Sequence, residues 1–587
     1  MSKTNKGLTN QTRRNFLSTM RNVGALGAMG ALGALSSNIA HSQKSQKRQL
    51  KTSNHHRKDR PNILFIVTDQ ERSWLDLPTE IDLPAHEYLL TQGTGFENYY
   101  VNTSPCSPSR SVIYTGRQTP DTGMTVNHGA PPFPELNQSL PTLGHYLRNE
   151  GYYTAYKGKW HLSHIESAPG LIYGNYPSRA NELEPFGFSD YNLTGDFHGS
   201  VWTGRKMDSI IASEAKHWLE TKATNINQPW CLSVNFVNPH DVMFYSTGPE
   251  QEASRLQETF LAPLRPEPAH ELYTKDWSHV GLPKSFYAGL KDKPWAHTSF
   301  EKLLNDIFGH IPKDQEELWL ANQSYYFNCI RDVSRQAYEV ISSLEKIGQL
   351  ENTIIVYTAD HGEMAGAHGL RQKGPTIYKE NSRVPLLIKH PDVQGGTTTK
   401  QLASAVDLVP TLLDMISSTQ ETELVGHSVL PALTKTTTKR DEQGLLFAYG
   451  VLLYADPNFM RGMIESETGP TLGNILKNSI TNGSLGPDLS NRALHRGIFD
   501  GRYKFARYYA TDSHHTPTDW DMLTTHNDLE LYDTHSDPDE IHNLAAAPNK
   551  HKELILALNE KTNALVAKEI GKDDGREFTG PSMLYQL

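Results

Sequence analysis

The chain has 587 residues, of which 37% are hydrophobic and 21% charged, and its formal net charge is −10. This length exceeds the size at which one hydrophobic core stops growing, so we expect more than one folded domain. The composition excludes a membrane-embedded protein, and the negative charge argues against a broad cationic surface for nucleic acid. The three cysteines, at positions 106, 231 and 329, are too few and too scattered for a disulfide framework or a thiolate zinc site.

The first 40 residues have the pattern of an export signal. Arg13 and Arg14 precede an uncharged stretch from Val23 to Leu35 that is rich in Ala, Gly and Leu. This stretch is shorter than the roughly 20 residues of a membrane-spanning helix, and it resembles a bacterial twin-arginine signal rather than an ordinary amphipathic helix. Residues 1–40 are therefore predicted to engage the twin-arginine export machinery, which would place the protein in the periplasm or outside the cell. Residues 41–60 are predicted to be a disordered spacer.

From Pro61 onward, short apolar runs alternate with helical patterns. This predicts an α/β domain with a mostly parallel central sheet and helices on both faces. Four predicted strands run into ionisable side chains: Ile63–Val67 before Asp69, Tyr152–Tyr156 before Lys159 and His161, Cys231–Val237 before His240, and Ile354–Tyr357 before Asp360 and His361. Ligands bind beyond the carboxyl ends of such strands, so these side chains are predicted to meet in one crevice.

The second half of the chain divides into two patterns. Helical spacing from Tyr325 to Gly348 predicts a crossover helix. Beyond about residue 430, two apolar runs around Asp500-Gly501 predict an antiparallel hairpin, and a helix is predicted from about Lys550 to Lys568. We therefore expect a catalytic domain over residues 61–430 and a smaller α+β domain with an antiparallel sheet over residues 431–587.

The most specific motif is Cys106-Ser107-Pro108-Ser109-Arg110, which is followed by Thr115-Gly116-Arg117. Pro108 suits the first turn of a helix that runs to about Tyr114. Residue 106 then lies near a helix N-terminus, where free amides and the helix dipole favour an anion. The alternative is a buried structural cysteine at a helix start.

With these motifs the chain resembles the formylglycine-dependent sulfatases of the alkaline-phosphatase-like superfamily, from Asn62 to Leu544. In that family the maturation motif is Cys-x-Pro-x-Arg with a downstream Thr-Gly-Arg, and a formylglycine-generating enzyme oxidises the cysteine. The resemblance implies an alkaline-phosphatase-like fold, hydrolysis of sulfate esters, and conversion of Cys106 to formylglycine (3-oxoalanine). A hydroxyl of the hydrated aldehyde would attack sulfur, and Arg110 would hold the diol or its sulfated form.

The resemblance also implies a divalent metal ion held by Asp69, Gln70, residue 106, Asp360 and His361. Gln70 and His361 stand where many sulfatases have Asp and Asn, and both departures are similar to choline-sulfatase-like and phosphonate-hydrolase-like branches. Calcium is the expected ion. Manganese or another transition metal is the alternative, because an imidazole ligand suits it better.

Four further residues match family positions with assigned roles. Lys159 would clamp oxygens of the nucleophile or sulfate, and His161 would take the proton that lets sulfate leave. His240 would protonate the departing alcohol, and Lys373 would bind sulfate. The segment Leu529–Asp533, with Asp537-Pro538 and Asn543-Leu544, resembles the family's C-terminal signature and is expected to pack the small domain on the large one.

Two competing functions remain open at this point. The first is a phosphonate monoester or phosphodiester hydrolase with the same formylglycine and metal, which Gln70 and His361 permit but Lys159 and His161 disfavour. The second is an inactive anion-binding protein with an unmodified Cys106. For a sulfatase, a sulfated oligo- or polysaccharide is the preferred substrate, while choline sulfate and simple aryl sulfates stay open. His368, Trp277 and Trp295 are candidate sugar contacts.

Overall fold

The computed structural model describes residues 60–128, 134–165, 182–191, 195–256, 262–420, 422–451, 454–465 and 488–578. The predicted signal over 1–40 lies outside these residues, as does the predicted spacer except for its last residue. The described residues other than 78–82 belong to one compact unit. None of their helices is long and apolar enough to cross a membrane.

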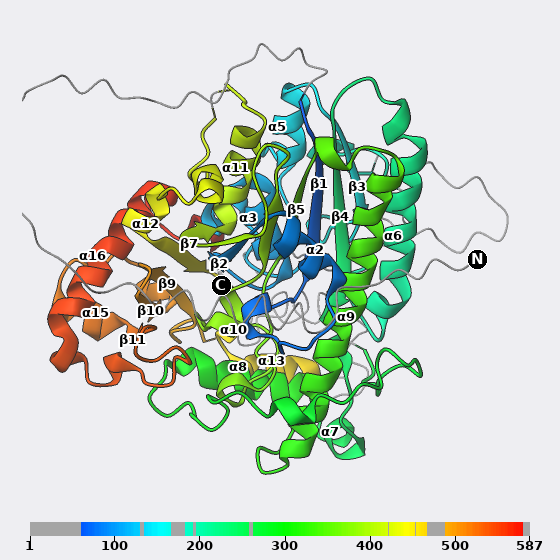
Figure 1. The fold of residues 1–587 in the computed structure, drawn as a ribbon. Coiled ribbons are helices and arrows are strands. Elements are labelled where there is room, and N and C mark those ends of the chain that lie inside the picture. Colours follow the sequence, from blue (N-terminus) through cyan, green and yellow to red (C-terminus); the bar gives the residue numbers. More distant parts are fainter. Residues whose placement is uncertain are drawn as a thin grey trace, which may run out of the picture. The chain divides into compact units, whose positions relative to one another are not determined.

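A seven-stranded sheet forms the centre of the fold (Figure 1). Its strand order is β3-β4-β1-β5-β6-β2-β7. The strands are β1 (Asn62–Asp69), β2 (Thr94–Tyr100), β3 (Tyr153–Gly158), β4 (Trp230–Pro239), β5 (Thr353–Ala359), β6 (Leu386–Lys389) and β7 (Thr397–Ser404). All pairings are parallel except those of β6, which runs antiparallel to β5 and β2. The predicted mostly parallel sheet is therefore confirmed, and so are the four strands predicted from apolar runs.

Helices cover this sheet on two sides (Figure 1). On one side α6 (Thr203–Thr221) and α9 (Glu316–Lys346) pack on each other and on β4, and α2 (Pro84–Gln92) packs on α9. On the other side α3 (Cys106–Thr115), α5 (Leu143–Asn149) and α11 (Leu408–Met415) contact one another. Because both faces are covered, the central strands are buried along their whole length, which explains their nearly continuous apolar runs.

The chain after residue 430 contributes a second sheet, which is antiparallel and has the order β11-β10-β9-β8. Its strands are β8 (Leu445–Tyr449), β9 (Leu494–Phe499), β10 (Tyr503–Tyr509) and β11 (Asp528–Asp533). The predicted hairpin is confirmed: β9 and β10 are joined at Asp500-Gly501, where Gly501 adopts a left-handed φ of 95°. Helix α16 (Lys552–Glu569) packs on this sheet through Ile555, Leu558 and Leu565. The domain boundary at 430/431 stays a prediction.

The remaining helices fill the connections. They are α4 (Thr119–Thr122), α7 (Pro249–Ala253), α8 (Trp295–Phe308), α10 (Lys379–Ser382), α12 (Lys439–Gln443), α13 (Pro457–Glu465) and α15 (Trp520–His526). The crossover helix α9 begins at Glu316, earlier than the predicted Tyr325, because its first turns carry adjacent apolar residues, Leu318, Trp319 and Leu320, instead of the helical spacing that marks its later part.

The register of the parallel strands brings four chain segments together at one edge. Thr68 pairs with Ala359, so Asp69 and Asp360 follow each other on neighbouring strands. Asp69 pairs with Pro239, the residue before His240. Gly158 pairs with Asn235, so Lys159 leaves the sheet beside β4. The crevice predicted at the carboxyl ends of the strands thus has a structural basis in strand pairing.

Candidate active site

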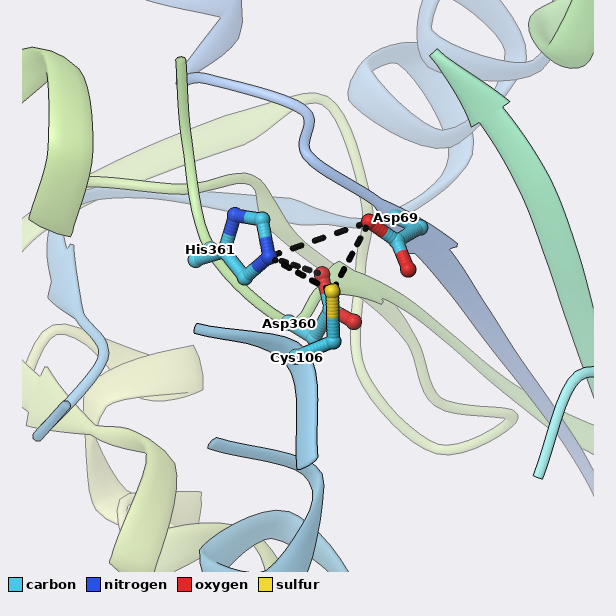
Figure 2. A group of neighbouring side chains, drawn as sticks. All are labelled: Asp69, Cys106, Asp360 and His361. Atoms are coloured by element: carbon cyan, nitrogen blue, oxygen red, sulfur yellow. Dashed lines mark hydrogen bonds and ion pairs between the residues drawn. The ribbon is translucent and has the colours of Figure 1, made fainter. Parts of the chain in front are cut away.

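Four buried side chains meet at this edge of the sheet, and we call them the metal cluster: Asp69, Cys106, Asp360 and His361 (Figure 2). One potential ligand atom from each lies within 4.8 Å of all the others. His361 Nε2 lies 3.7 Å from Asp69 Oδ1 and 3.7 Å from Asp360 Oδ1. Two carboxylates and a ring nitrogen converge in a site shielded from water, which fits a divalent cation.

The tautomer of His361 also fits a metal ligand. Its Nδ1 lies 3.0 Å from the carbonyl oxygen of Gly362, which can only accept a hydrogen bond, so Nδ1 carries the hydrogen. The lone pair is then on Nε2, the atom that faces the cluster. Burial, partly opposed by Asp360, lowers the pKa of His361. A neutral ring whose outer nitrogen is fixed by a backbone carbonyl is the usual arrangement of a histidine ligand.

The two carboxyl groups differ in their neighbours. Burial disfavours the charge of Asp69, but the positive charges around it, that of Lys159 first, outweigh it and hold the pKa of Asp69 well below its ordinary value. Burial, followed by the charge of Asp69, raises the pKa of Asp360. A divalent ion would relieve this repulsion between the carboxylates.

Cys106 is the first residue of α3, as the motif predicted. Its thiol lies 3.6 Å from Asp69 Oδ1, to which it donates, and 3.2 Å from His361 Nε2. Burial, followed by the charge of Asp69, raises the pKa of the thiol to about 12. Ser107 Oγ donates to the carbonyl of His161 at 2.6 Å, and Ser109 Oγ donates to the carbonyl of Asp360. These two hydrogen bonds hold the first turn of α3 against the segments that follow β3 and β5.

Gln70 lies beside the cluster with its side chain already bonded. Its amide nitrogen donates to Glu363, and its amide oxygen, the predicted metal ligand, accepts from Lys373. Lys373 Nζ also lies 2.7 Å from Met243 Sδ. Lys373 therefore lies beside the metal cluster and is connected to it by its hydrogen bond to Gln70. The role of Gln70 as a metal ligand stays a prediction.

Arg110 is fully buried one turn along α3 from Cys106. Its Nη1 pairs with Asp360 Oδ2 at 3.1 Å. The other guanidinium nitrogens donate to the carbonyls of Lys159 and Trp160, to Asn235 Oδ1 and to Tyr156. Arg110 therefore orients Asp360 and the turn after β3, and a direct contact with the nucleophile stays a prediction.

Lys159 pairs with the opposite side of the cluster, with its Nζ 2.5 Å from Asp69 Oδ2. It can reach this position because Gly158 has a φ of 93° and lies against β4, where a Cβ would come within 1.9 Å of the carbonyl oxygen of Asn235. Only glycine accommodates this approach. Lys159 Nζ also donates to the carbonyl of His198 at 2.5 Å.

His161 and His240 are both buried, and each has a ring nitrogen without a hydrogen-bond partner among the described residues. In His161 that atom is Nδ1, since Nε2 lies 2.8 Å from the carbonyl of His128 and must donate to it. Burial first, then His198 and Lys159, lower the pKa of His161 well below its ordinary value. Burial first, then Lys373 and Lys159, do the same to the pKa of His240. Both shifts favour the neutral ring.

Two neighbours of these histidines were not predicted from the sequence. The carboxylate of Asp196 accepts the backbone N–H groups of Trp160 and His161, at 2.9 and 2.5 Å. The ring of His198 stacks on that of His161 with centroids 4.2 Å apart. Neither residue follows a strand, so the rule that found the other site residues could not find them. Their only sequence signal is an Asp and a His between two glycines, Gly195 and Gly199.

The C-terminal signature reaches the same loop as Lys373. Glu530 Oε1 accepts from Tyr508 Oη at 2.5 Å, and Tyr508 Oη lies 2.9 Å from the carbonyl oxygen of Pro375. Tyr454 Oη donates to the carbonyl of Lys373 at 3.3 Å. The antiparallel sheet thus supports the segment that carries Lys373, in line with the packing role expected for the signature.

Two of the three candidate sugar contacts, Trp277 and His368, are buried in the structure. Trp277 is fully buried and its Nε1 donates to Asn328 Oδ1 at 2.9 Å. His368 is also fully buried, with its ring stacked on Tyr378 at 3.6 Å. Both side chains belong to the core and cannot bind an external sugar as they stand. Trp295 is the first residue of α8 and half-buried.

Known proteins show the same sequence pattern and fold. The family model described as Sulfatase matches residues 61–418. N-acetylglucosamine-6-O-sulfatase of Bacteroides thetaiotaomicron is 27% identical over 418 residues, covering 64% of this chain and 71% of that protein. Among solved structures, a 2-O GAG sulfatase aligns with a TM-score of 0.62 at 20% identity, covering 89% of this chain and 96% of that one. A phosphonate monoester hydrolase of Agrobacterium radiobacter aligns with a TM-score of 0.59 at 20% identity, covering 87% and 96%.

The structural likenesses confirm the predicted alkaline-phosphatase-like fold. The family model spans more than half of the chain and includes the whole metal cluster, Arg110, Lys159, His161, His240 and Lys373. The chain therefore belongs to the sulfatase family and is a sulfuric ester hydrolase.

Proposed function

We propose that this sulfatase hydrolyses sulfate esters of carbohydrates through a formylglycine formed from Cys106 beside a divalent metal ion. The observation that carries the proposal is the position of Cys106, whose Sγ lies 3.2 Å from His361 Nε2 at the start of α3. A side chain there faces two carboxylates and the amide end of a helix at once. The maturation motif supplies the reason for the modification, and the formylglycine-generating enzyme is the partner that it requires.

The metal would be held by Asp69, Asp360, His361 and residue 106. Gln70 would be a fifth ligand if its amide oxygen released the hydrogen bond from Lys373 and bound the ion instead. When bound, the ion would lower the pKa of a hydroxyl on residue 106 and draw the sulfate group to it. Calcium is the expected ion from the two carboxylates, and manganese or another transition metal the alternative from the imidazole. Metal analysis of the purified holoenzyme decides between them.

The basic side chains lie on different sides of the metal cluster. Lys159 on the Asp69 side and Lys373 on the Gln70 side bring positive charge to opposite flanks of the place where sulfate would bind. Arg110 would keep Asp360 ionised and oriented. These positive charges would stabilise the negative charge that develops as the ester bond breaks.

The two neutral histidines would handle protons. The free lone pair of His161 Nδ1 suits a base, which would take a proton from residue 106 so that sulfate can leave. His240 would act as the acid for the leaving alcohol. The negative charge of a bound sulfate ester would counteract the effect of Lys373 on His240 and favour its protonated form.

Relatives support the carbohydrate part of the proposal. One acts on N-acetylglucosamine-6-O-sulfate by its name, and one similar structure is a 2-O GAG sulfatase.

Export from the cytoplasm is part of the same proposal, because an enzyme for sulfated polymers and their fragments would meet them outside the cytoplasm. Arg13 and Arg14 support a twin-arginine route to the periplasm or beyond. Replacement of both by Lys should keep the protein in the cytoplasm, which cell fractionation would detect.

A panel of sulfated mono- and oligosaccharides tests the function, with choline sulfate and para-nitrophenyl sulfate as further substrates. The matured wild-type enzyme should release sulfate from at least one sugar. Activity confined to choline or aryl sulfates would contradict the carbohydrate assignment and leave the sulfatase chemistry standing.

The second candidate is phosphonate monoester hydrolysis, which the metal-side residues Gln70 and His361 and the likeness to a phosphonate monoester hydrolase favour. Phenyl phosphonate esters in the same assay would separate the two functions. A kcat/KM higher for the phosphonate than for every sulfate ester would favour this candidate.

A further inference from the structure

The segment Gly195–Gly199 contacts three of the proposed catalytic residues. Asp196 binds the backbone N–H of His161, and the carbonyl of His198 accepts from Lys159. A Cβ added to Gly199 would come within 2.2 Å of His240 Nδ1, so this glycine lies directly against the His240 ring. One short segment thus lines the side of the site where both proton-handling histidines lie.

Asp196 fixes the position of this segment. His161 adopts a left-handed φ of 58°, which is uncommon for a residue other than glycine. The Asp196 carboxylate satisfies two successive backbone N–H groups of that turn and is itself buried. Burial opposes its charge, but His198 and these N–H groups hold the pKa of Asp196 below its ordinary value. An ionised Asp196 therefore ties the turn to the neighbouring imidazole.

His198 differs from the other residues of the site in being accessible. Its side chain is 34% exposed, whereas those of Asp196 and Lys159 are 3% and 0% exposed. One face of the His198 ring covers His161 with an interplanar angle of 23°. Its Nε2 lies 3.3 Å from Asp196 Oδ2, and no hydrogen bond of its Nδ1 is found within the parts of the chain that the structure describes.

The stacked geometry argues against a direct proton transfer between the two rings. The N–H bonds of an imidazole lie in the ring plane, so nearly parallel rings do not point their N–H groups at each other. His198 therefore does not pass a proton to His161 through a hydrogen bond. What it offers is an exposed ring edge with a nitrogen that can bond to a hydroxyl.

We propose that His198 contacts the alcohol part of the substrate and helps to determine which sulfate esters are accepted. The inference rests on the proposed function, in which His240 protonates the leaving oxygen. Gly199 lies against the His240 ring, so the residue before it lies close to the place of the leaving alcohol. Asp196 holds the ring by its Nε2 and leaves Nδ1 for a substrate hydroxyl.

The test compares His198→Phe and His198→Ala with the wild type on para-nitrophenyl sulfate, nitrocatechol sulfate and N-acetylglucosamine-6-O-sulfate. The last two carry hydroxyls on the alcohol part, and the first has none. His198→Phe keeps a ring to stack on His161 but removes both nitrogens. The quantity to measure is kcat/KM, because it stops at the first irreversible step, cleavage of the ester bond, and excludes the later expulsion of sulfate that His161 serves.

We expect His198→Phe to lower kcat/KM for the hydroxyl-bearing esters by about 3- to 10-fold more than for para-nitrophenyl sulfate, as for one lost hydrogen bond. His279→Phe, which makes the same replacement in another exposed ring stacked on an aromatic side chain, Trp277, is the matched control and should leave the ratios unchanged. Thermal unfolding of each variant checks that the fold is intact.

Equal losses on all esters that the wild type hydrolyses would overturn the role of His198 while the proposed function stands. A burst of alcohol followed by a stall in His198→Phe, with unchanged ratios, would likewise overturn it, because His198 would then act through His161. A matured wild-type enzyme that hydrolyses none of the esters would overturn the proposed function and the role of His198 together.

Discussion

Lys159 and Arg110 bind opposite carboxylates of the metal cluster: Lys159 Nζ lies 2.5 Å from Asp69 Oδ2, and Arg110 Nη1 lies 3.1 Å from Asp360 Oδ2. Each acid therefore has one oxygen paired with a buried cation and the other turned toward His361. This arrangement fixes both carboxylates before a metal binds. It also means that loss of one acid leaves a buried cation unpaired, which is destabilising.

The first prediction concerns Asp360→Ala. The variant should lose the metal and the activity together, because one of two anionic ligands is gone. Addition of a chelator should lower the unfolding temperature of the wild type but not of the variant, since a ligand bound only to the native state stabilises it. Metal content by elemental analysis and thermal unfolding measure both effects.

Asp208→Asn is the control for Asp360→Ala, since Asp208 is a buried acid that accepts backbone N–H groups of β4 and lies outside the cluster. It should lower stability but keep the metal. Full metal stoichiometry in Asp360→Ala would remove Asp360 from the site.

The second prediction concerns His161→Ala. If His161 drives the expulsion of sulfate, cleavage of the ester should stay fast in the variant while release of sulfate stops. Rapid mixing should show a burst of alcohol followed by a stall, and the mass of the peptide with residue 106 should rise by one sulfate. Absence of that adduct under single-turnover conditions would assign the expulsion step to another group.

The third prediction concerns His240→Ala. Loss of the acid should lower kcat/KM by about 10²- to 10⁴-fold for sugar sulfates, whose alcohols are poor leaving groups. The loss should be much smaller for para-nitrophenyl sulfate, because nitrophenolate leaves without a proton. Equal losses on both classes would refute the assignment of His240 to the leaving oxygen.

The fourth prediction is a pH dependence that follows from the same residue. His240 must be protonated to act as an acid, and burial with Lys373 holds its pKa well below 6.5. Since kcat/KM reports the free enzyme, its value for a sugar sulfate should fall as pH rises toward neutrality through that lowered pKa. This decrease of kcat/KM with pH should be small for para-nitrophenyl sulfate and absent in His240→Ala. A decrease of equal size in the variant would assign the titration to another group.

Most of the site could be predicted because its residues follow parallel strands. Asp69, Lys159, His240 and Asp360 each lie at the end of a buried strand or directly after it, and strand register brings them together. Cys106 could be predicted from its motif and from the helix that Pro108 starts. The same reasoning predicted four strands of the central sheet, the crossover helix α9, the hairpin of β9 and β10, and α16, but it missed β2, β6 and β7 of the central sheet.

Other features depend on contacts that no local pattern encodes. Asp196 and His198 precede α6 in a segment without periodicity, and only the folded chain brings them to His161. The bond between Gln70 and Lys373 joins residues 303 positions apart. The sequence offers Trp277 as a candidate sugar contact, but in the fold Asn328 of α9 accepts the hydrogen bond of its ring nitrogen and the side chain is fully buried.

The central claim is that residue 106, once oxidised to formylglycine, carries the hydrolysis of sulfate esters. The most direct measurement is the rate of sulfate release plotted against the fraction of residue 106 present as formylglycine, determined by peptide mass spectrometry. Preparations made with increasing amounts of formylglycine-generating enzyme supply the range, and Cys106→Ala supplies the zero point. The account predicts a straight line through the origin. A rate that is independent of the formylglycine fraction, or retained in Cys106→Ala, would contradict it.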